Sequence, residues 1–251
     1  MKRVLITGAA RRIGAQIART LASDGWHVAI HFGASRENAE AVAAEITAQG
    51  GHAVTVRADL SQPGSPQRLI DEATAALGPL DALINNASLF EYDALDTLSE
   101  AALDRHFAVN ARAPVMLSKA FAQTIGPGRE GCVINLLDNK VFAPNPDYFS
   151  YTISKLALHG ATPLLTLALA PRVRVNAIAP GITLISGEQS QANFERGHTL
   201  NPLGKGCTPD QIARTVQYIL ATPALNGAVI TIDGGQSIAN PGRDVAFIAP
   251  G

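Results

Sequence analysis

Near its beginning the 251-residue chain reads Val4-Leu5-Ile6-Thr7-Gly8-Ala9-Ala10-Arg11-Arg12-Ile13-Gly14. A short apolar run ends just before Gly8, and apolar residues then recur at helical spacing as far as Ser23. This pattern predicts a strand, a tight turn and a helix. Gly8 permits the turn and Gly14 allows close packing of the helix, whose first amides are then available to an anion.

The same alternation continues along the whole chain. Strands of continuous apolar residues that alternate with helices indicate a parallel sheet covered on both faces. The sequence therefore predicts one doubly wound, Rossmann-type α/β domain over residues 1–251, with a parallel seven-stranded sheet. We expect strands at 4–6, 28–30, 53–56, 82–84, 132–134, 173–175 and 229–232, and helices at 13–23, 37–48, 67–77, 99–124 (as one helix or two), 151–169 and 209–221.

Two segments lie outside this alternation. Residues 182–208 follow the sixth strand and are rich in Gly, Ser, Gln and Asn. A long insertion after a parallel strand lies on the carboxyl edge of the sheet, where ligands bind, so this segment is predicted to be an irregular substrate lid. The tail, residues 237–251, contains the apolar run Val245-Ala246-Phe247-Ile248. It is expected to reach a neighbouring subunit, to close over a site, or to be loose.

Composition argues against several classes of partner. The formal net charge of -1 is unlike that of a nucleic-acid surface or a polybasic membrane patch. Cys132 and Cys207 are too few and too far apart for a disulfide framework, and the six histidines lack the spacing of metal ligands. With neither a signal peptide nor a membrane span in the pattern, we expect a cytoplasmic protein without a metal site that acts on a small molecule.

A second motif, Tyr151-Thr152-Ile153-Ser154-Lys155, has the spacing of a proton-transfer pair. Residues four apart share one face of a helix, so Tyr151 and Lys155 are predicted to point into one site. A fixed positive charge near a phenol favours the phenolate and makes the hydroxyl a stronger acid. Asp138, thirteen residues upstream, is expected to face the same site.

The turn at residues 7–14 is typical of dinucleotide-binding proteins, and the second strand indicates which dinucleotide. An acidic residue at the end of that strand selects NAD, but this chain reads His31-Phe32-Gly33-Ala34-Ser35-Arg36. Ser35 and Arg36 offer a hydroxyl and a charge to a 2'-phosphate, and Arg11 or Arg12 adds to the positive field. The sequence therefore favours NADPH. The alternative is that Arg36 only begins a helix on a solvated face.

Together these motifs resemble the short-chain dehydrogenase/reductase family. The resemblance runs from Thr7 to Asp233-Gly234-Gly235 and includes Asn85-Asn86-Ala87, Asn110 and Pro180-Gly181. It implies that Tyr151 donates or accepts a proton, that Lys155 binds the nicotinamide ribose and lowers the pKa of Tyr151, and that Asn110 holds a water of the proton relay. The residues and the resemblance together predict cofactor contacts at Gly8, Arg11, Arg12, Ile13, Gly14, His31, Ser35, Arg36, Asp59, Leu60, Asn86, Ala87, Tyr151, Lys155, Pro180 and Gly181.

Departures from the general family pattern resemble the pteridine reductase branch, including its dihydromonapterin-reducing members. Arg12 replaces a usual Gly, Asp138 replaces a usual Ser, and Asn85-Asn86-Ala87-Ser88 is followed by Phe90; residues 194–202 also look like that branch. The resemblance implies that Phe90 stacks on a pterin opposite the nicotinamide and that Arg12 contacts both phosphate and pterin. The implied catalytic residues are Asp138, Tyr151, Lys155 and Asn110, the implied substrate contacts are Arg12, Ser88, Phe90, Asp138 and Tyr151, and a homotetramer is expected.

The reaction implied is reduction of a dihydropterin or dihydrofolate, in which hydride goes to the carbon of a C=N bond and a proton to its nitrogen. Asp138 has two open roles. Holding a proton at neutral pH requires its pKa to rise by about three units, about 4 kcal/mol; otherwise it stays ionised and accepts hydrogen bonds while Tyr151 gives the proton. The plainer alternatives are that Asp138 only caps a turn and that Phe90 is an ordinary loop aromatic. Two other functions stay open: a carbonyl reductase for a ketone, sugar or acyl substrate, and a dinucleotide-sensing protein without turnover.

Overall fold

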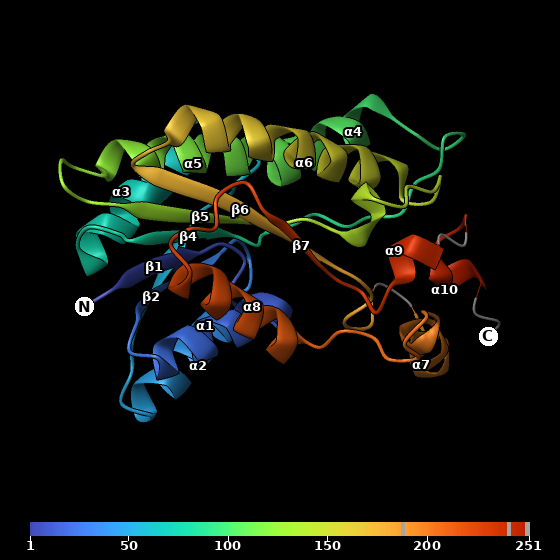
Figure 1. The fold of residues 1–251 in the computed structure, drawn as a ribbon, viewed down its shortest axis with the longest axis horizontal. Coiled ribbons are helices and arrows are strands. Elements are labelled where there is room, and N and C mark those ends of the chain that lie inside the picture. Colours follow the sequence, from blue (N-terminus) through green and yellow to red (C-terminus); the bar gives the residue numbers. More distant parts are fainter. Residues whose placement is uncertain (187–188, 240–241, 249–251) are drawn as a thin grey trace.

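One seven-stranded sheet forms the centre of the molecule (Figure 1). The computed structural model describes residues 1–186, 189–239 and 242–248. All neighbouring strands pair in parallel, in the order β3-β2-β1-β4-β5-β6-β7. This confirms the predicted doubly wound sheet, with strands β1 (Arg3–Ile6), β2 (His27–Phe32), β3 (His52–Arg57), β4 (Ala82–Asn85), β5 (Gly131–Leu136), β6 (Val173–Pro180) and β7 (Val229–Ile232).

Helices cover both faces of the sheet (Figure 1). One face carries α1 (Arg12–Ser23), α2 (Arg36–Ala48) and α8 (Pro209–Ala221). The other carries α3 (Ser65–Leu77), α5 (Ala113–Thr124) and α6 (Phe149–Leu169), with α4 (Glu100–Phe107) packed against α6. The strand order reverses between β1 and β4, and parallel sheets bind ligands at the carboxyl ends of the strands beside such a switch point.

The two faces of the sheet pack against separate hydrophobic cores. In β1, Val4 and Ile6 lie in the core beneath α1, α2 and α8, whereas Leu5 lies in the core on the other face. All three side chains are fully buried. Because successive residues of a strand point to opposite faces, a sheet covered on both sides needs continuous apolar runs, as the sequence pattern indicated.

The region predicted as one or two helices over 99–124 contains an interruption. Between α4 and α5 lies a π-helical turn, η1 (Ala108–Arg112). Pro114, in the first turn of α5, has no amide hydrogen for the carbonyl of Asn110, so the α-helical hydrogen bonding is broken at this point. Such turns often mark functional positions in helices.

The segment expected to be an irregular lid contains a helix, α7 (Gln191–Thr199). The side chain of Ser190 accepts a hydrogen bond of 3.1 Å from the amide of Asn193, which caps the helix. The prediction of irregular structure was wrong for these residues, because a polar composition does not prevent a helix that begins at a capping serine. The tail also contains helices, α9 (Gln236–Ala239) and α10 (Val245–Ile248).

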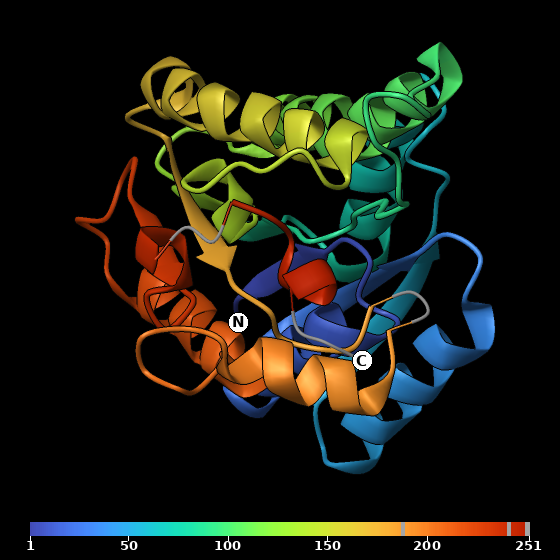
Figure 2. The same cartoon turned by 90° about the vertical axis from the view of Figure 1, so that its right-hand side faces the viewer.

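The lid helix and the tail lie together at the carboxyl edge. In Figure 1, α7, α9 and α10 stand beyond the carboxyl ends of the strands, opposite the N-terminus. Figure 2 looks onto this edge and shows α10 between the layer of α6 and the helix α7, with which it is in contact. These elements therefore surround the region where a ligand of a parallel sheet is expected.

Candidate active site

A cavity of about 1270 Å³ opens at this carboxyl edge. It brings together residues that follow β1, β2, β3, β4, β5 and β6, which lie far apart in the sequence. The predicted site residues that line it are Gly8, Arg11, Arg12, Ile13, Gly14, His31, Ser35, Asp59, Leu60, Asn86, Ala87, Ser88, Phe90, Asp138, Tyr151, Lys155, Pro180 and Gly181. Two predicted residues, Arg36 and Asn110, do not line it.

The glycine turn is closed against the loop after β4. Gly8 has a φ of 63°, and a Cβ at this position would lie 2.9 Å from the Cα of Ala87. A Cβ at Gly14 would lie 2.4 Å from the carbonyl oxygen of Gly8 and 2.5 Å from the side-chain nitrogen of Asn86. That nitrogen donates to the carbonyls of Thr7 (2.9 Å) and Gly8 (3.1 Å). Only glycine fits at both positions, because a side chain there would collide with the turn itself or with the loop after β4.

The start of α1 is suited to a phosphate. Its N-cap residue, Arg11, is extended and supplies no capping hydrogen bond from its side chain. The first amides of the helix therefore face the cavity without a side-chain acceptor, which is the arrangement that binds a phosphate at a helix N-terminus.

Arg12 joins the turn to the lid. It adopts a φ of 56°, a left-handed conformation in which a non-glycine residue costs about 1 kcal/mol. Its guanidinium donates to the carbonyl of Ile185 (2.6 Å) and to the hydroxyl of Ser186 (3.4 Å). The departure from the usual Gly therefore places a cation between the turn and residues 182–186.

His31 supports the turn from β2. Its Nδ1 atom accepts a hydrogen bond of 3.0 Å from the amide of Gly8, and its Nε2 atom lies 3.1 Å from the carbonyl of Ala58. These partners require a neutral ring with the hydrogen on Nε2. Burial lowers the pKa of His31 to about 4, so the ring stays neutral near pH 7 and fixes the position of the turn.

Arg36 does not take the position predicted for it. Its guanidinium pairs with Glu40 at 3.2 Å and lies over the ring of Phe32, with most of the side chain exposed. Because Arg36 already lies in α2, its side chain follows the helix surface and pairs one turn ahead. Two other cations line the cavity instead, Arg57 and Arg68. The sequence could have indicated Arg57, because Arg57 is the last residue of β3 and pairs with the last residue of β2.

Asp138 and Tyr151 are directly hydrogen bonded. The hydroxyl of Tyr151 donates to Oδ2 of Asp138 at 2.7 Å, and the amide of Lys140 donates to Oδ1 at 2.9 Å. Asp138 comes from the segment after β5 and also caps the short helix η2 (Asn139–Val141). Burial raises the pKa of Asp138, and burial together with Asp138 raises the pKa of Tyr151. The capping role and the site role of Asp138 thus coexist.

Lys155 points into the same site from one helical turn further along α6. Its ammonium donates to the carbonyl of Leu136 at 2.8 Å and lies 5.7 Å from the centre of the Tyr151 ring. Burial lowers the pKa of Lys155 to about 8. Burial and the carboxyl of Asp138 raise the pKa of Tyr151, and the lowering that the resemblance implies for Lys155 stays a prediction.

Asn110 stands behind the site and ties its walls together. Its side chain accepts from the amide of Leu89 (2.7 Å) and the hydroxyl of Ser88 (3.2 Å). It donates to the carbonyl of Leu89 (2.8 Å) and to the hydroxyl of Ser154 (3.0 Å). The fully buried amide therefore links η1, the loop after β4 and α6, and does not itself reach the cavity.

Phe90 lies between two tyrosines. Its ring stacks on Tyr148 with centroids 4.2 Å apart and meets the edge of Tyr151 at 4.6 Å. Tyr148 precedes α6 in a left-handed conformation, with a φ of 55°. The sequence pattern singled out neither Tyr148 nor the cavity residues Lys140, Arg243 and Asp244, because no motif marks them and only the tertiary fold brings the tail to this edge.

The start of α6 is held by a distant carboxylate. Asp93, in the loop after β4, accepts a hydrogen bond of 2.9 Å from the amide of Ser150 and a second, short one from its hydroxyl. Both residues are buried. This contact fixes the helix that carries Tyr151 and Lys155 relative to the loop that carries Phe90.

Among the residues that the structure describes, no group of three or more His, Cys, Asp and Glu side chains is arranged to hold a metal ion. Over the same residues, no helix has the length and apolar character needed to cross a membrane.

Known proteins resemble this chain over nearly its whole length. The FolM alternative dihydrofolate reductase 1 of Brucella suis, solved in complex with NADP, is 44% identical, with a TM-score of 0.91 and coverage of 94% of this chain and 95% of that one. An uncharacterised oxidoreductase of Methylorubrum extorquens is 34% identical over 93% of this chain and 97% of its own length. The 3-oxoacyl-[acyl-carrier-protein] reductase FabG of Staphylococcus aureus is 32% identical over 94% and 98%.

A family model agrees with these likenesses. The model described as short chain dehydrogenase matches residues 2–195, which include the glycine turn, Asp138, Tyr151 and Lys155. The chain therefore belongs to the short-chain dehydrogenase family.

Proposed function

We propose that this protein is an NADPH-dependent reductase of pterins, which converts a dihydropterin or dihydrofolate to its tetrahydro form. The observation that carries the proposal is the hydrogen bond between Tyr151 and Asp138, beside the ring of Phe90 in one cavity. The similarity to the FolM dihydrofolate reductase of Brucella suis supports it.

The residues present fit a dinucleotide. Gly8 and Gly14 let the turn pack closely against the loop after β4, and both line the cavity. The start of α1 offers amides to a pyrophosphate, and Arg57 supplies a cation where β2 and β3 end. When bound, NADPH would supply the hydride. The NADP complex of the similar Brucella protein supports the phosphorylated form of the cofactor.

The protein's part in the reaction is to hold the ring and supply the proton. Tyr151 and Asp138 form an acid pair, in which the hydroxyl of Tyr151 carries the hydrogen that the carboxyl accepts. As the ring nitrogen gains negative charge, Tyr151 donates its phenolic proton to that nitrogen. Burial raises the pKa of Asp138: a protonated Asp138 returns a proton to Tyr151, whereas an ionised Asp138 accepts hydrogen bonds from the ring amino groups. Lys155, within 6 Å of the phenol ring, stabilises the phenolate that forms.

A second candidate is reduction of a carbonyl substrate. The FabG proteins, which are named as 3-oxoacyl-[acyl-carrier-protein] reductases, are similar to this chain over nearly its whole length. Tyr151 and Lys155 would serve that reaction equally well. Asp138 favours the pterin substrate, because a carboxyl can bind the donor groups of a pterin whereas a ketone offers none.

The deciding experiment compares substrates and one variant. NADPH oxidation is followed with dihydrobiopterin, dihydromonapterin and dihydrofolate and with a panel of simple ketones, for the wild type and for Asp138→Ser. We expect turnover with pterins that is lost in the variant. Turnover of ketones alone by the wild type would show that the protein is a carbonyl reductase. The same conclusion would follow if the wild type had no pterin activity and Asp138→Ser gained ketone activity.

Three further predictions accompany this function. A homotetramer, a cytoplasmic location and a lid formed by residues 182–208 remain proposals. Sedimentation equilibrium of the purified protein tests the first, and protection of Arg196 from trypsin by cofactor and substrate tests the third.

A further inference from the structure

A buried lysine sits beside the acid pair and binds the tail. The side chain of Lys140 is 8% exposed. Its ammonium contacts the side-chain oxygen of Asn145 (2.8 Å), the carbonyl of Asp147 (3.0 Å) and Oδ2 of Asp244 (2.9 Å). Three oxygen acceptors hold the cation in place, and only Asp244 brings a full negative charge to it.

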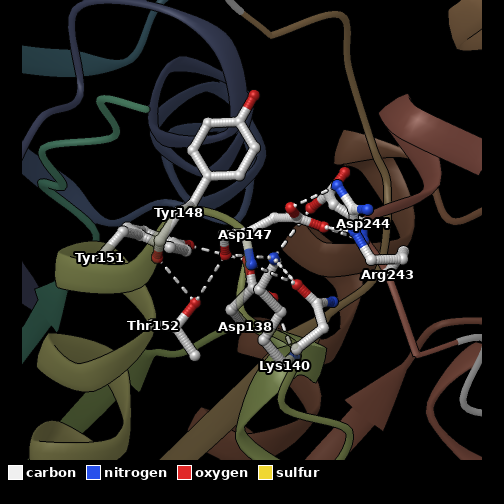
Figure 3. Close-up of polar contacts among 9 residues, drawn as sticks. Asp138, Lys140, Asp147, Tyr148, Tyr151, Thr152, Arg243 and Asp244 are labelled. Atoms are coloured by element: carbon white, nitrogen blue, oxygen red, sulfur yellow. Dashed lines mark hydrogen bonds and ion pairs between the residues drawn. The ribbon is translucent and has the colours of Figure 1, made fainter. Parts of the chain in front are cut away.

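The tail is fastened by a second charged pair. Arg243 donates through Nε and Nη2 to the two carboxylate oxygens of Asp147, both at 2.8 Å, and the amide of Asp244 donates to the same carboxylate at 2.8 Å. The ring of Phe247 lies 5.4 Å from Tyr92 and 6.3 Å from Tyr148. Figure 3 shows Arg243 and Asp244 reaching toward Asp147 and Lys140 from the tail side.

Lys140 also touches the acid pair. Its backbone amide binds Oδ1 of Asp138, whose other oxygen accepts from Tyr151. The positive charges of Lys140 and Lys155 favour the ionised form of Asp138. The negative charge of Asp244 acts in the opposite sense and raises the pKa of Tyr151.

We propose that Lys140 and Asp244 are positioning residues that act through Asp138, so that the ion pair between them determines how firmly the Asp138–Tyr151 pair holds its proton. The proposal rests on the proposed function, in which this pair supplies the proton. With the tail docked, Asp244 offsets the charge of Lys140 and the pair keeps its proton. When the negative charge of Asp244 alone is removed, Lys140 acts on Asp138 without that offset and the proton is more easily lost.

The charges around Asp138 leave few other candidates for this control. From α6 it is faced by Tyr151 and Lys155, and from η2 by Lys140. Asp147 and Arg243 are paired with each other, so their charges largely cancel at a distance. A substitution of Asp244 that leaves the Arg243–Asp147 pair in place therefore changes only the balance between Lys140 and Asp244.

Two substitutions should change this field in opposite directions. Lys140→Met keeps the backbone amide that binds Asp138 but removes the cation, and should raise the titration midpoint of Asp138. Asp244→Asn keeps an oxygen acceptor for Lys140 but removes the anion, and should lower it. We expect each shift to be about one pH unit, a tenfold change in proton affinity.

The midpoint can be read without any substrate. Carboxyl carbon-13 NMR of protein labelled at the side-chain carboxyl of aspartate follows the titration, with the Asp138 signal assigned by its loss in Asp138→Asn. The pH profile of NADPH-dependent turnover should then move in the same direction for each variant. Lys140→Arg, which keeps the charge, should behave as the wild type, and Asp210→Asn on the exposed surface of α8 is the matched control for Asp244→Asn.

The outcomes are distinct. Opposite shifts in the two variants support the proposal, whereas unchanged midpoints, or shifts in the same direction, would overturn it and leave Lys140 a structural residue. If Lys140→Met does not fold, as judged by its thermal unfolding, Asp244→Asn alone decides the matter. If the two variants shift the Asp138 midpoint in opposite directions but the wild type does not turn over pterins, the proposed function is wrong and the control of Asp138 by the Lys140–Asp244 pair still stands.

Discussion

The hydroxyl of Tyr151 lies 2.7 Å from Oδ2 of Asp138, so the phenol of α6 and the carboxyl after β5 act as one titrating unit. The hydrogen bond from Tyr151 favours the ionised form of Asp138, but burial outweighs it and raises the pKa of Asp138. Burial and the carboxyl of Asp138 both raise the pKa of Tyr151. Two acids that interact this closely lose their protons in steps that belong to the pair. A pH profile of turnover will therefore report the pair and not Tyr151 alone.

Removing the phenolic hydroxyl should stop proton delivery while leaving the fold intact. In Tyr151→Phe the ring still packs against Phe90, but Asp138 loses its partner. We expect kcat to fall about a hundred- to ten-thousand-fold, the usual range for loss of a general acid, with NADPH affinity unchanged. Stopped-flow measurement of hydride transfer and fluorescence titration of NADPH test the two parts. A variant with near-normal kcat would show that another group gives the proton.

Asp93 should matter for both stability and catalysis, although it lies outside the cavity lining. Asp93→Ala removes two acceptors from Ser150, so the free energy of unfolding should fall by about 1–3 kcal/mol and kcat should fall with it. Asp93→Asn keeps one acceptor for the amide and is the matched control. Equal stability of the alanine variant and the wild type in urea would contradict this role.

Acid should destabilise the protein through His31. Its pKa in the fold is about 4, below the ordinary 6.5, so between these pH values the unfolded chain binds a proton that the native ring does not. Stability present above pH 6.5 is then lost as the pH falls, by up to about 3 kcal/mol near pH 4. Urea unfolding at about pH 7.5 and about pH 4.5 measures the loss.

The control for this prediction is His31→Asn. Asparagine can accept from the amide of Gly8 but does not titrate, so the variant should show a smaller loss of stability on acidification than the wild type. Equal losses in both proteins would assign the acid sensitivity to other groups.

Arg57, and not Arg36, should set the preference for NADPH over NADH. Arg57 lines the cavity at the end of β3, whereas Arg36 is paired with Glu40. In Arg57→Gln the KM for NADPH should rise about ten- to a hundred-fold, as expected for a lost charge-assisted hydrogen bond, and the KM for NADH should stay the same. Arg36→Gln is the matched control and should change neither. If Arg36→Gln raises the KM for NADPH and Arg57→Gln does not, Arg36 is the residue that binds the 2'-phosphate.

Much of this architecture could be read from local patterns. The seven strands follow from continuous apolar runs, and the spacing of Tyr151 and Lys155 placed both in one site because a helix brings residues four apart to one face. The glycine turn was predictable in part, because Gly8 adopts a left-handed φ of 63° that favours glycine, although Ala87 and Asn86 from the loop after β4 also exclude a side chain at Gly8 and Gly14.

The parts that could not be read depend on contacts between distant segments. The raised pKa of Tyr151 could not be read, because it depends mainly on burial in the folded protein, to which Asp138 adds. The sequence did not indicate that Arg36 pairs with Glu40 along α2, and its role toward the 2'-phosphate stays a prediction. Arg243 of the tail contacts Asp147, which lies 96 residues earlier in the chain. Only the complete fold brings these two residues together.

The left-handed Arg12 has a kinetic consequence. One end of this residue shapes the turn that would receive the cofactor phosphates, and the other end holds the backbone of Ile185. A cofactor that binds at this turn must therefore move the side chain of Arg12, which also holds the backbone of Ile185 on the opposite side of the cavity. We expect the two reactants to add in a fixed sequence, cofactor before pterin, and the reaction to obey ordered kinetics because a single arginine serves both steps.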